Sequence, residues 1–106
     1  MGTLVYDQTT LAELDDRVLA HLQVVIINKL RRLESFSLTL TGANNTTRCV
    51  WVSPRTPLTF IYAGNRQPSL NRLWIEQLAE TANQASGLRV IPEPPFTDPM
   101  AGELAE

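Results

Sequence analysis

The sequence predicts an α+β fold, in which a mostly antiparallel sheet in the order β-β-α-β-β-β-α-β carries two helices on one face. Three features support this class: a long amphipathic helical stretch, a run of strictly alternating apolar and polar residues, and a second amphipathic stretch that ends before a glycine. With 106 residues, 43% of them hydrophobic and 19% charged, the composition is that of one globular domain without room for a second core.

The central helix is expected from Asp16 to Leu33, with Asp15 or Asp16 as its N-cap. The β-branched run at residues 24–27 favours a strand, but eighteen residues without Gly or Pro favour a helix. The side chains expected to face the core repeat with helical spacing: Val18, Leu19, Leu22, Val25, Ile26, Leu30 and Leu33.

Residues 9–14 are compatible with two structures. Thr10 and Glu13 match a capping box, which would start the central helix early. Alternatively, the segment is the second strand of a hairpin that turns at Asp7-Gln8, after a first strand at residues 3–6. We prefer the hairpin because the two aspartates at 15 and 16 are a stronger helix start.

Alternation and turn residues place the other elements. Strands are expected at residues 35–41, 47–52, 58–62 and 88–91. The first three of these have short links and predict a meander, with 47–52 near the middle of the sheet because both of its faces are apolar. A second helix is expected from an N-cap at Ser69 to about Ala85, with Leu70, Leu73, Trp74, Leu78, Ala82 and Ala85 facing inward. Trp51, Trp74 and Phe60 are expected to supply much of the burial.

Proline and charge indicate a boundary near residue 91. Residues 1–91 form the expected domain, with a slightly basic balance, and residues 92–106 form a Pro-rich acidic tail. Its Glu93 and Asp98 could fold back over basic surface, or Phe96 could cover apolar surface. Residues 1–10 lack the pattern of a secretory signal, no run is long and apolar enough to span a membrane, and a single cysteine permits no internal disulfide. We therefore expect a cytoplasmic protein.

The central helix carries a second, narrower apolar strip formed by Ala20, Val24 and Ile27. In one interpretation, another part of this chain covers the strip, as in most folds. Alternatively, the strip is an interface for a protein partner or a second copy, because apolar patches with polar rims mark such sites.

No catalytic or metal-binding constellation is visible in the sequence, and we expect neither a cofactor nor a metal site. His21 lies on the polar side of the helix and is expected to be exposed or to cap the helix, while Cys49 is expected to be a small buried residue of a strand. Arginines and an asparagine are the remaining candidates for contact with an anion or nucleic acid: Arg31, Arg32, Arg66, Asn71 and Arg72. Clustered lysines and interleaved aromatics, which strong nucleic-acid binders show, are lacking.

A resemblance that covers nearly the whole chain, from MGTLVY to IPEP, is carried by four strings: DDRVLAHLQVVIINKLRR, WVSPRTPLTF, GNRQPSLNRLWIEQLAETAN and GLRVIPEP. They resemble a family of small actinobacterial proteins of unknown function, often automatically labelled "ATP-dependent DNA ligase". Ligases of that class adenylate a lysine in a Lys-x-Asp-Gly motif, whereas Lys29, the only lysine here, is followed by Leu30, Arg31 and Arg32. The resemblance thus implies a source and a single domain, but no mechanism.

We therefore expect a small, non-catalytic binding or protein-interaction module that self-associates or serves as an accessory subunit. The alternative is a weak binder of nucleic acid or of a phosphate ligand, associated with DNA metabolism.

Overall fold

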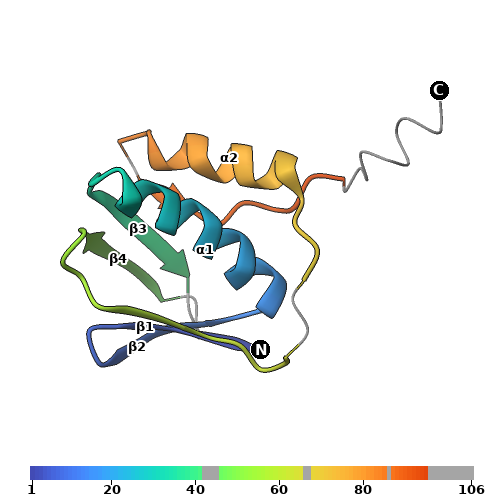
Figure 1. Cartoon of the computed structure of the whole chain (residues 1–106), viewed down its shortest axis with the longest axis horizontal. Coiled ribbons are helices and arrows are strands. Elements are labelled where there is room, and N and C mark those ends of the chain that lie inside the picture. Colours follow the sequence, from blue (N-terminus) through green and yellow to red (C-terminus); the bar gives the residue numbers. More distant parts are fainter. Residues whose placement is uncertain (42–45, 66–67, 86, 96–106) are drawn as a thin grey trace.

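A computed structural model describes residues 1–41, 46–65, 68–85 and 87–95 of the chain. Within these ranges it contains two helices and six strands. The elements, in chain order, are β1 (Gly2–Tyr6), β2 (Thr9–Leu14), α1 (Asp16–Arg31), β3 (Phe36–Thr41), β4 (Thr47–Val52), β5 (Leu58–Ile61), α2 (Arg72–Ala82) and β6 (Leu88–Arg89). The α+β class and the order of elements are confirmed (Figure 1).

The strands form two three-stranded sheets, with the orders β2-β1-β5 and β4-β3-β6. All pairs are antiparallel except β3 with β6. The predicted meander is therefore wrong in its last step, because β5 pairs with β1 and leaves β4 at a sheet edge. The link between β4 and β5 explains the change: the Ser53 carbonyl accepts from Thr56 N–H in a turn, and the Pro57 carbonyl accepts from Asp7 N–H at 2.9 Å. This last bond attaches the link to the β1–β2 turn.

The hairpin interpretation of residues 9–14 is confirmed. Asp7 and Gln8 both have positive φ, 45° and 71°, which is the backbone of the tight turn that suits the twist of two paired strands. Leu4 pairs with Ala12 and Val5 with Thr10, so Leu11 is an extra residue in a bulge.

Helix α1 is continuous through residues 24–27, as predicted, but ends two residues earlier than expected. Asp15 is its N-cap and accepts from Arg17 N–H. At the other end Leu33 has φ 59° and is exposed, so the expectation that it faces the core is wrong. The Glu34 N–H turns back to the Lys29 carbonyl, which closes the helix end.

Helix α2 begins at Arg72, with Asn71 rather than Ser69 as its N-cap. The Asn71 side-chain oxygen accepts from Trp74 N–H, satisfying a backbone donor of the first turn. This later start leaves Leu70 outside the helix. Both Leu70 and Leu73, predicted to face inward, are exposed, whereas Trp74 and Leu78 are buried as expected.

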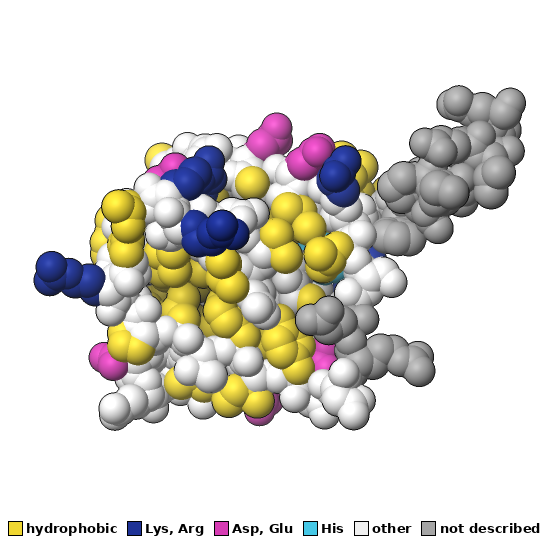
Figure 2. All heavy atoms as spheres, viewed as in Figure 1, with side chains coloured by type: hydrophobic (Ala, Val, Ile, Leu, Met, Phe, Trp, Pro, Cys, Tyr) yellow, Lys and Arg dark blue, Asp and Glu magenta, His cyan; other side chains and the backbone are white. Residues whose placement is uncertain are grey.

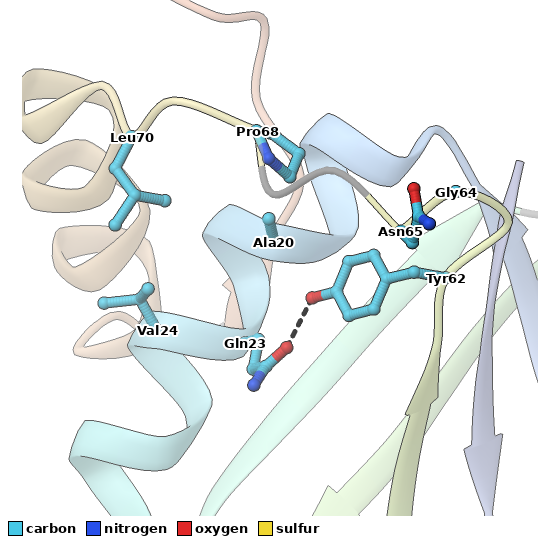
Figure 3. A pocket seen from close by; sticks show the side chains of 8 residues that line it. All are labelled: Ala20, Gln23, Val24, Tyr62, Gly64, Asn65, Pro68 and Leu70. Carbon is cyan, nitrogen blue, oxygen red and sulfur yellow. Dashed lines mark hydrogen bonds between the residues drawn. The ribbon is translucent and has the colours of Figure 1, made fainter.

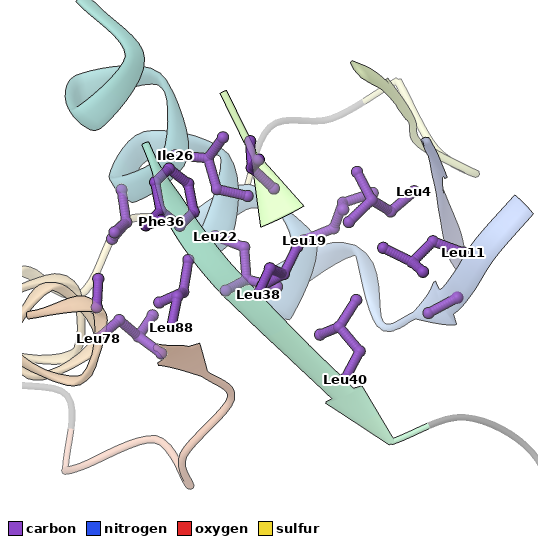
Figure 4. Packing of buried hydrophobic residues seen from close by; sticks show 14 of the residues in the cluster. Leu4, Leu11, Leu19, Leu22, Ile26, Phe36, Leu38, Leu40, Leu78 and Leu88 are labelled. Carbon is purple, nitrogen blue, oxygen red and sulfur yellow. The ribbon is translucent and has the colours of Figure 1, made fainter. Parts of the chain in front are cut away.

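The two helices run parallel and side by side over the sheets (Figure 1). Three α1 side chains fill the centre of the core, between Leu4 and Leu11 of one sheet and the β3 side chains of the other (Figure 4): Leu19, Leu22 and Ile26. Burial of such a side chain stabilises the fold by about 1.5–3 kcal/mol. Helix α1 is therefore the element that ties the two sheets together.

Two predictions of burial on β4 are wrong. Trp51 is 61% exposed and Cys49 is also exposed. Trp51 pairs with Ser37, next to the Phe36–Val52 pair, whose side chains are buried. Because side chains alternate along a strand, Trp51 and Cys49 lie on the face of the sheet that points away from the helices.

Candidate functional site

The Ala20–Val24 part of the second apolar strip forms the floor of a pocket of about 360 Å³. One wall is the segment after β5, and the other is the segment that leads into α2. The lining residues are Ala20, Gln23, Val24, Tyr62, Gly64, Asn65, Pro68 and Leu70. None of these described residues is charged, so the part of the pocket that they line suits an apolar or neutral group.

Hydrogen bonds hold the first wall in place. The Tyr62 hydroxyl donates to the side-chain oxygen of Gln23 on α1 (Figure 3). The Asp16 carboxylate accepts from the N–H groups of Ala63, at 3.2 Å, and Gly64, at 3.1 Å. These backbone bonds lower the pKa of Asp16, and burial raises the pKa of Tyr62. The first wall is thus fixed to the helix floor at two places.

The strip and the start of α2 leave large apolar side chains in contact with solvent. Ile27 is 38% exposed, Leu70 50% and Leu73 46%. Hydrophobic side chains gather on the side of the molecule where α1 crosses the view (Figure 2). We call the surface made by Ala20, Val24, Ile27 and Leu70 the α1 face; Leu73 lies one residue before the buried Trp74 and is not part of it.

A polar network on the neighbouring side of α1 binds it to α2 and to the end of the described chain. Arg17 donates to both carboxylate oxygens of Glu93, at 2.8 and 2.6 Å, and to the Ser69 carbonyl. The Asn71 side chain also donates to Glu93, at 3.0 Å. The bonds from Arg17 and then from Asn71 lower the pKa of Glu93 to about 2. Residue 93 is therefore anchored on the domain.

His21 lies inside this network, which corrects the prediction that it is exposed. Its Nδ1 lies 2.7 Å from the Arg17 carbonyl, and its Nε2 accepts from Asn71 N–H at 2.7 Å. The ring packs against Trp74 with centroids 4.5 Å apart. Burial lowers the pKa of His21, and an accepting Nε2 requires the neutral ring with its proton on Nδ1. His21 therefore fixes the residue at which α2 starts. None of these hydrogen bonds joins it to a residue that lines the pocket.

A scan of family models matches residues 1–93 to a domain of unknown function, DUF7882. The chain belongs to this family. No curated protein and no solved structure matches it. The matched region ends at Glu93, the residue whose carboxylate binds Arg17.

In this DUF7882 domain, the predicted anion-contact residues are not gathered in one place. Arg31 and Arg32 are exposed at the end of α1, whereas Arg72 is exposed at the start of α2. Because the helices are parallel and Asn71 contacts His21, the two groups lie about 15 Å apart along the helix axis. Asn71 is buried and used as a cap, and Arg66 lies outside the described residues.

Lys29 is also buried, which the sequence did not predict. Its Nζ donates to Glu34 at 3.0 Å and to the Asn83 side chain at 2.6 Å, which joins the ends of the two helices. No signal in the sequence alone reveals this role, because both partners depend on how α2 packs. Phe96 and Asp98, predicted as tail contacts, lie outside the described residues.

Other classes of site find no support among the described residues. Within them, no three His, Cys, Asp or Glu side chains are grouped so that they could hold a metal ion. The helices described have neither the length nor the apolar character to cross a membrane.

Proposed function

We propose that this DUF7882 domain is a non-catalytic protein-interaction module, and that the α1 face is its contact surface. The observation that carries the proposal is the exposure of Ile27 and Leu70 at a pocket whose described lining residues are all uncharged. Apolar surface in water is unfavourable by about 25 cal/mol per Å², and a clustered patch with a polar rim is typical of an interface.

The charge distribution supports protein contact over nucleic-acid contact. Of the predicted contact residues, Arg31 and Arg32 stand at one end of the helix pair and Arg72 at the other, and Arg32 already lies 3.6 Å from a Glu34 carboxylate oxygen. Nucleic-acid binding relies on several cations that track a phosphate backbone. A contact surface built on apolar side chains requires no such arrangement.

Photo-crosslinking in cells of the source organism tests the proposal. A photoreactive phenylalanine analogue replaces Ile27 in one variant and Leu70 in a second. The control replaces Thr59, an exposed residue of β5 that pairs with Val5 on the outer side of its sheet. We expect adducts of defined mass from positions 27 and 70 and none from position 59. Absence of adducts from both positions on the face, with the folded protein present, contradicts the proposal.

A further inference from the structure

The apolar strip on α1 has a midpoint through which a two-fold axis can pass. Ala20 and Ile27 mark its ends, and Val24 lies near its midpoint. A surface that packs on a second copy of itself with two-fold symmetry places its own centre on the axis, and residues on either side exchange partners. Two α1 helices packed this way run antiparallel and cross near Val24.

The two ends of α1 carry opposite charge. At the start, Asp15, Asp16 and Glu93 supply three carboxylates against the two guanidinium groups of Arg17 and of Arg72 on the adjacent start of α2. At the end, Lys29, Arg31 and Arg32 supply three cations against the two carboxylates of Glu34 and of Glu80 in the last turn of α2. An antiparallel pair therefore brings the basic end of each helix to the acidic end of the other.

We propose that the partner of the α1 face is a second copy of this chain, packed antiparallel about Val24 so that Ile27 of each copy enters the pocket of the other. This inference rests on the proposed function and specifies its partner. It gives the pocket a role, because the uncharged lining is suited to an aliphatic side chain.

The spacing of the helix supports this fit. With the axis at Val24, Ile27 of one copy is level with residue 21 of the other, one residue or about 1.5 Å from Ala20 along the axis. Ala20 is the smallest side chain of the floor, and it leaves space above it between Tyr62 and Leu70. The most exposed apolar residue of the strip thus meets the least bulky one.

The same alignment of the two helices determines which charged residues of the two copies come level. Arg31, seven residues after Val24, comes level with Arg17 of the other copy. The Arg17 guanidinium is paired with Glu93, so the carboxylates of Asp15 and Asp16 leave this end of the helix negative. Exposed opposite charges add specificity and direct orientation more than they add affinity. They select the antiparallel pair, because a parallel pair would place like charges together at both ends.

Crosslinking of single cysteines tests the arrangement. In a Cys49→Ser background, which removes the exposed native thiol, a short bis-maleimide is added to Val24→Cys or to Leu33→Cys. Antiparallel packing places the two Val24 positions together at the axis and the two Leu33 positions about 27 Å apart along it. We expect rapid formation of a covalent dimer from Val24→Cys and none from Leu33→Cys, although Leu33 is the more exposed residue.

Sedimentation measurements provide a second test. Ala20→Leu fills the pocket floor and should raise the dissociation constant by roughly tenfold or more, whereas Ala85→Leu, an exposed site after α2, should leave it unchanged. Arg31→Glu should weaken the dimer, and Arg55→Glu in the β4–β5 link should not.

Each failure has its own meaning. Equal crosslinking at Val24→Cys and Leu33→Cys, none at either, or an Ala20→Leu variant that dimerises normally overturns the second-copy arrangement. Photo-adducts from position 27 that have the mass of another protein overturn it too, while the interaction module remains. Absence of any photo-adduct overturns the proposed function itself.

Discussion

Ile26 and Ile27 are adjacent, chemically identical residues of α1 that should respond very differently to truncation. Ile26 is 0% exposed and Ile27 is 38% exposed. Ile26→Ala removes three buried carbons, which contribute about 0.8 kcal/mol each, or about 2.4 kcal/mol together. The cavity left between the sheets adds to this loss, so we expect a total of about 2–5 kcal/mol. Ile27→Ala removes carbons that already contact water, and the better helix propensity of alanine offsets roughly 0.5 kcal/mol.

Urea unfolding followed by circular dichroism measures both losses, at a protein concentration low enough to keep the wild type monomeric. For a domain of this size, 1 kcal/mol corresponds to about 4–8 °C, so Ile26→Ala should melt on the order of 10–20 °C lower. Ile27→Ala should stay within about 1 kcal/mol of the wild type. Equal losses in the two variants, or no loss in Ile26→Ala, would refute the packing of α1 between the two sheets.

Three further predictions concern ionisable groups. Glu93 has a folded pKa of about 2 against an ordinary 4.5, so it should stabilise the fold above pH 4.5 and lose this contribution as the pH falls toward 2. Glu93→Gln should flatten that part of a curve of stability against pH. His21 has a folded pKa below 6.5, so its neutral ring should stabilise the fold above pH 6.5 and lose this effect as the pH falls through the folded pKa; an NMR titration that places the ring at or above 6.5 contradicts this. Incubation with ATP and Mg²⁺ should leave Lys29 without an adenylate in mass spectra, because its Nζ is buried between Glu34 and Asn83; an adenylated Lys29 peptide would reverse this conclusion.

Local pattern predicted the elements well but not the partners of the strands. Alternation along residues 58–61 identifies a strand and its inward residues, Leu58 and Phe60, without naming the strand beside it. The neighbour is decided by contacts between distant residues, such as the bond from Asp7 N–H to the Pro57 carbonyl. A meander was the simplest assumption, and one turn that redirects the chain was enough to make it wrong.

The start of α2 shows the same limit at a single residue. Ser69 and Asn71 are both good N-caps, and nothing in the local sequence separates them. In the folded domain, His21 accepts the Asn71 N–H, and the Asn71 side chain contacts Glu93. Long-range bonds therefore selected the cap, and the choice left Leu70 in the segment before the helix, exposed beside the pocket.

The candidate site arises because the polar side of α1 is buried and part of its second apolar strip is exposed. The side that looks polar in the sequence, with Arg17, His21 and Lys29, is the side on which α2 and residue 93 pack, and each of these polar groups has hydrogen-bond partners there. Burial of such groups is tolerable only with those partners, so α2 is committed to that side. Within the described residues, the segments on either side of the apolar strip reach its edges and leave Ile27 and Leu70 in water. An apolar face that the described part of its own chain leaves exposed is most simply explained by a surface from outside the domain.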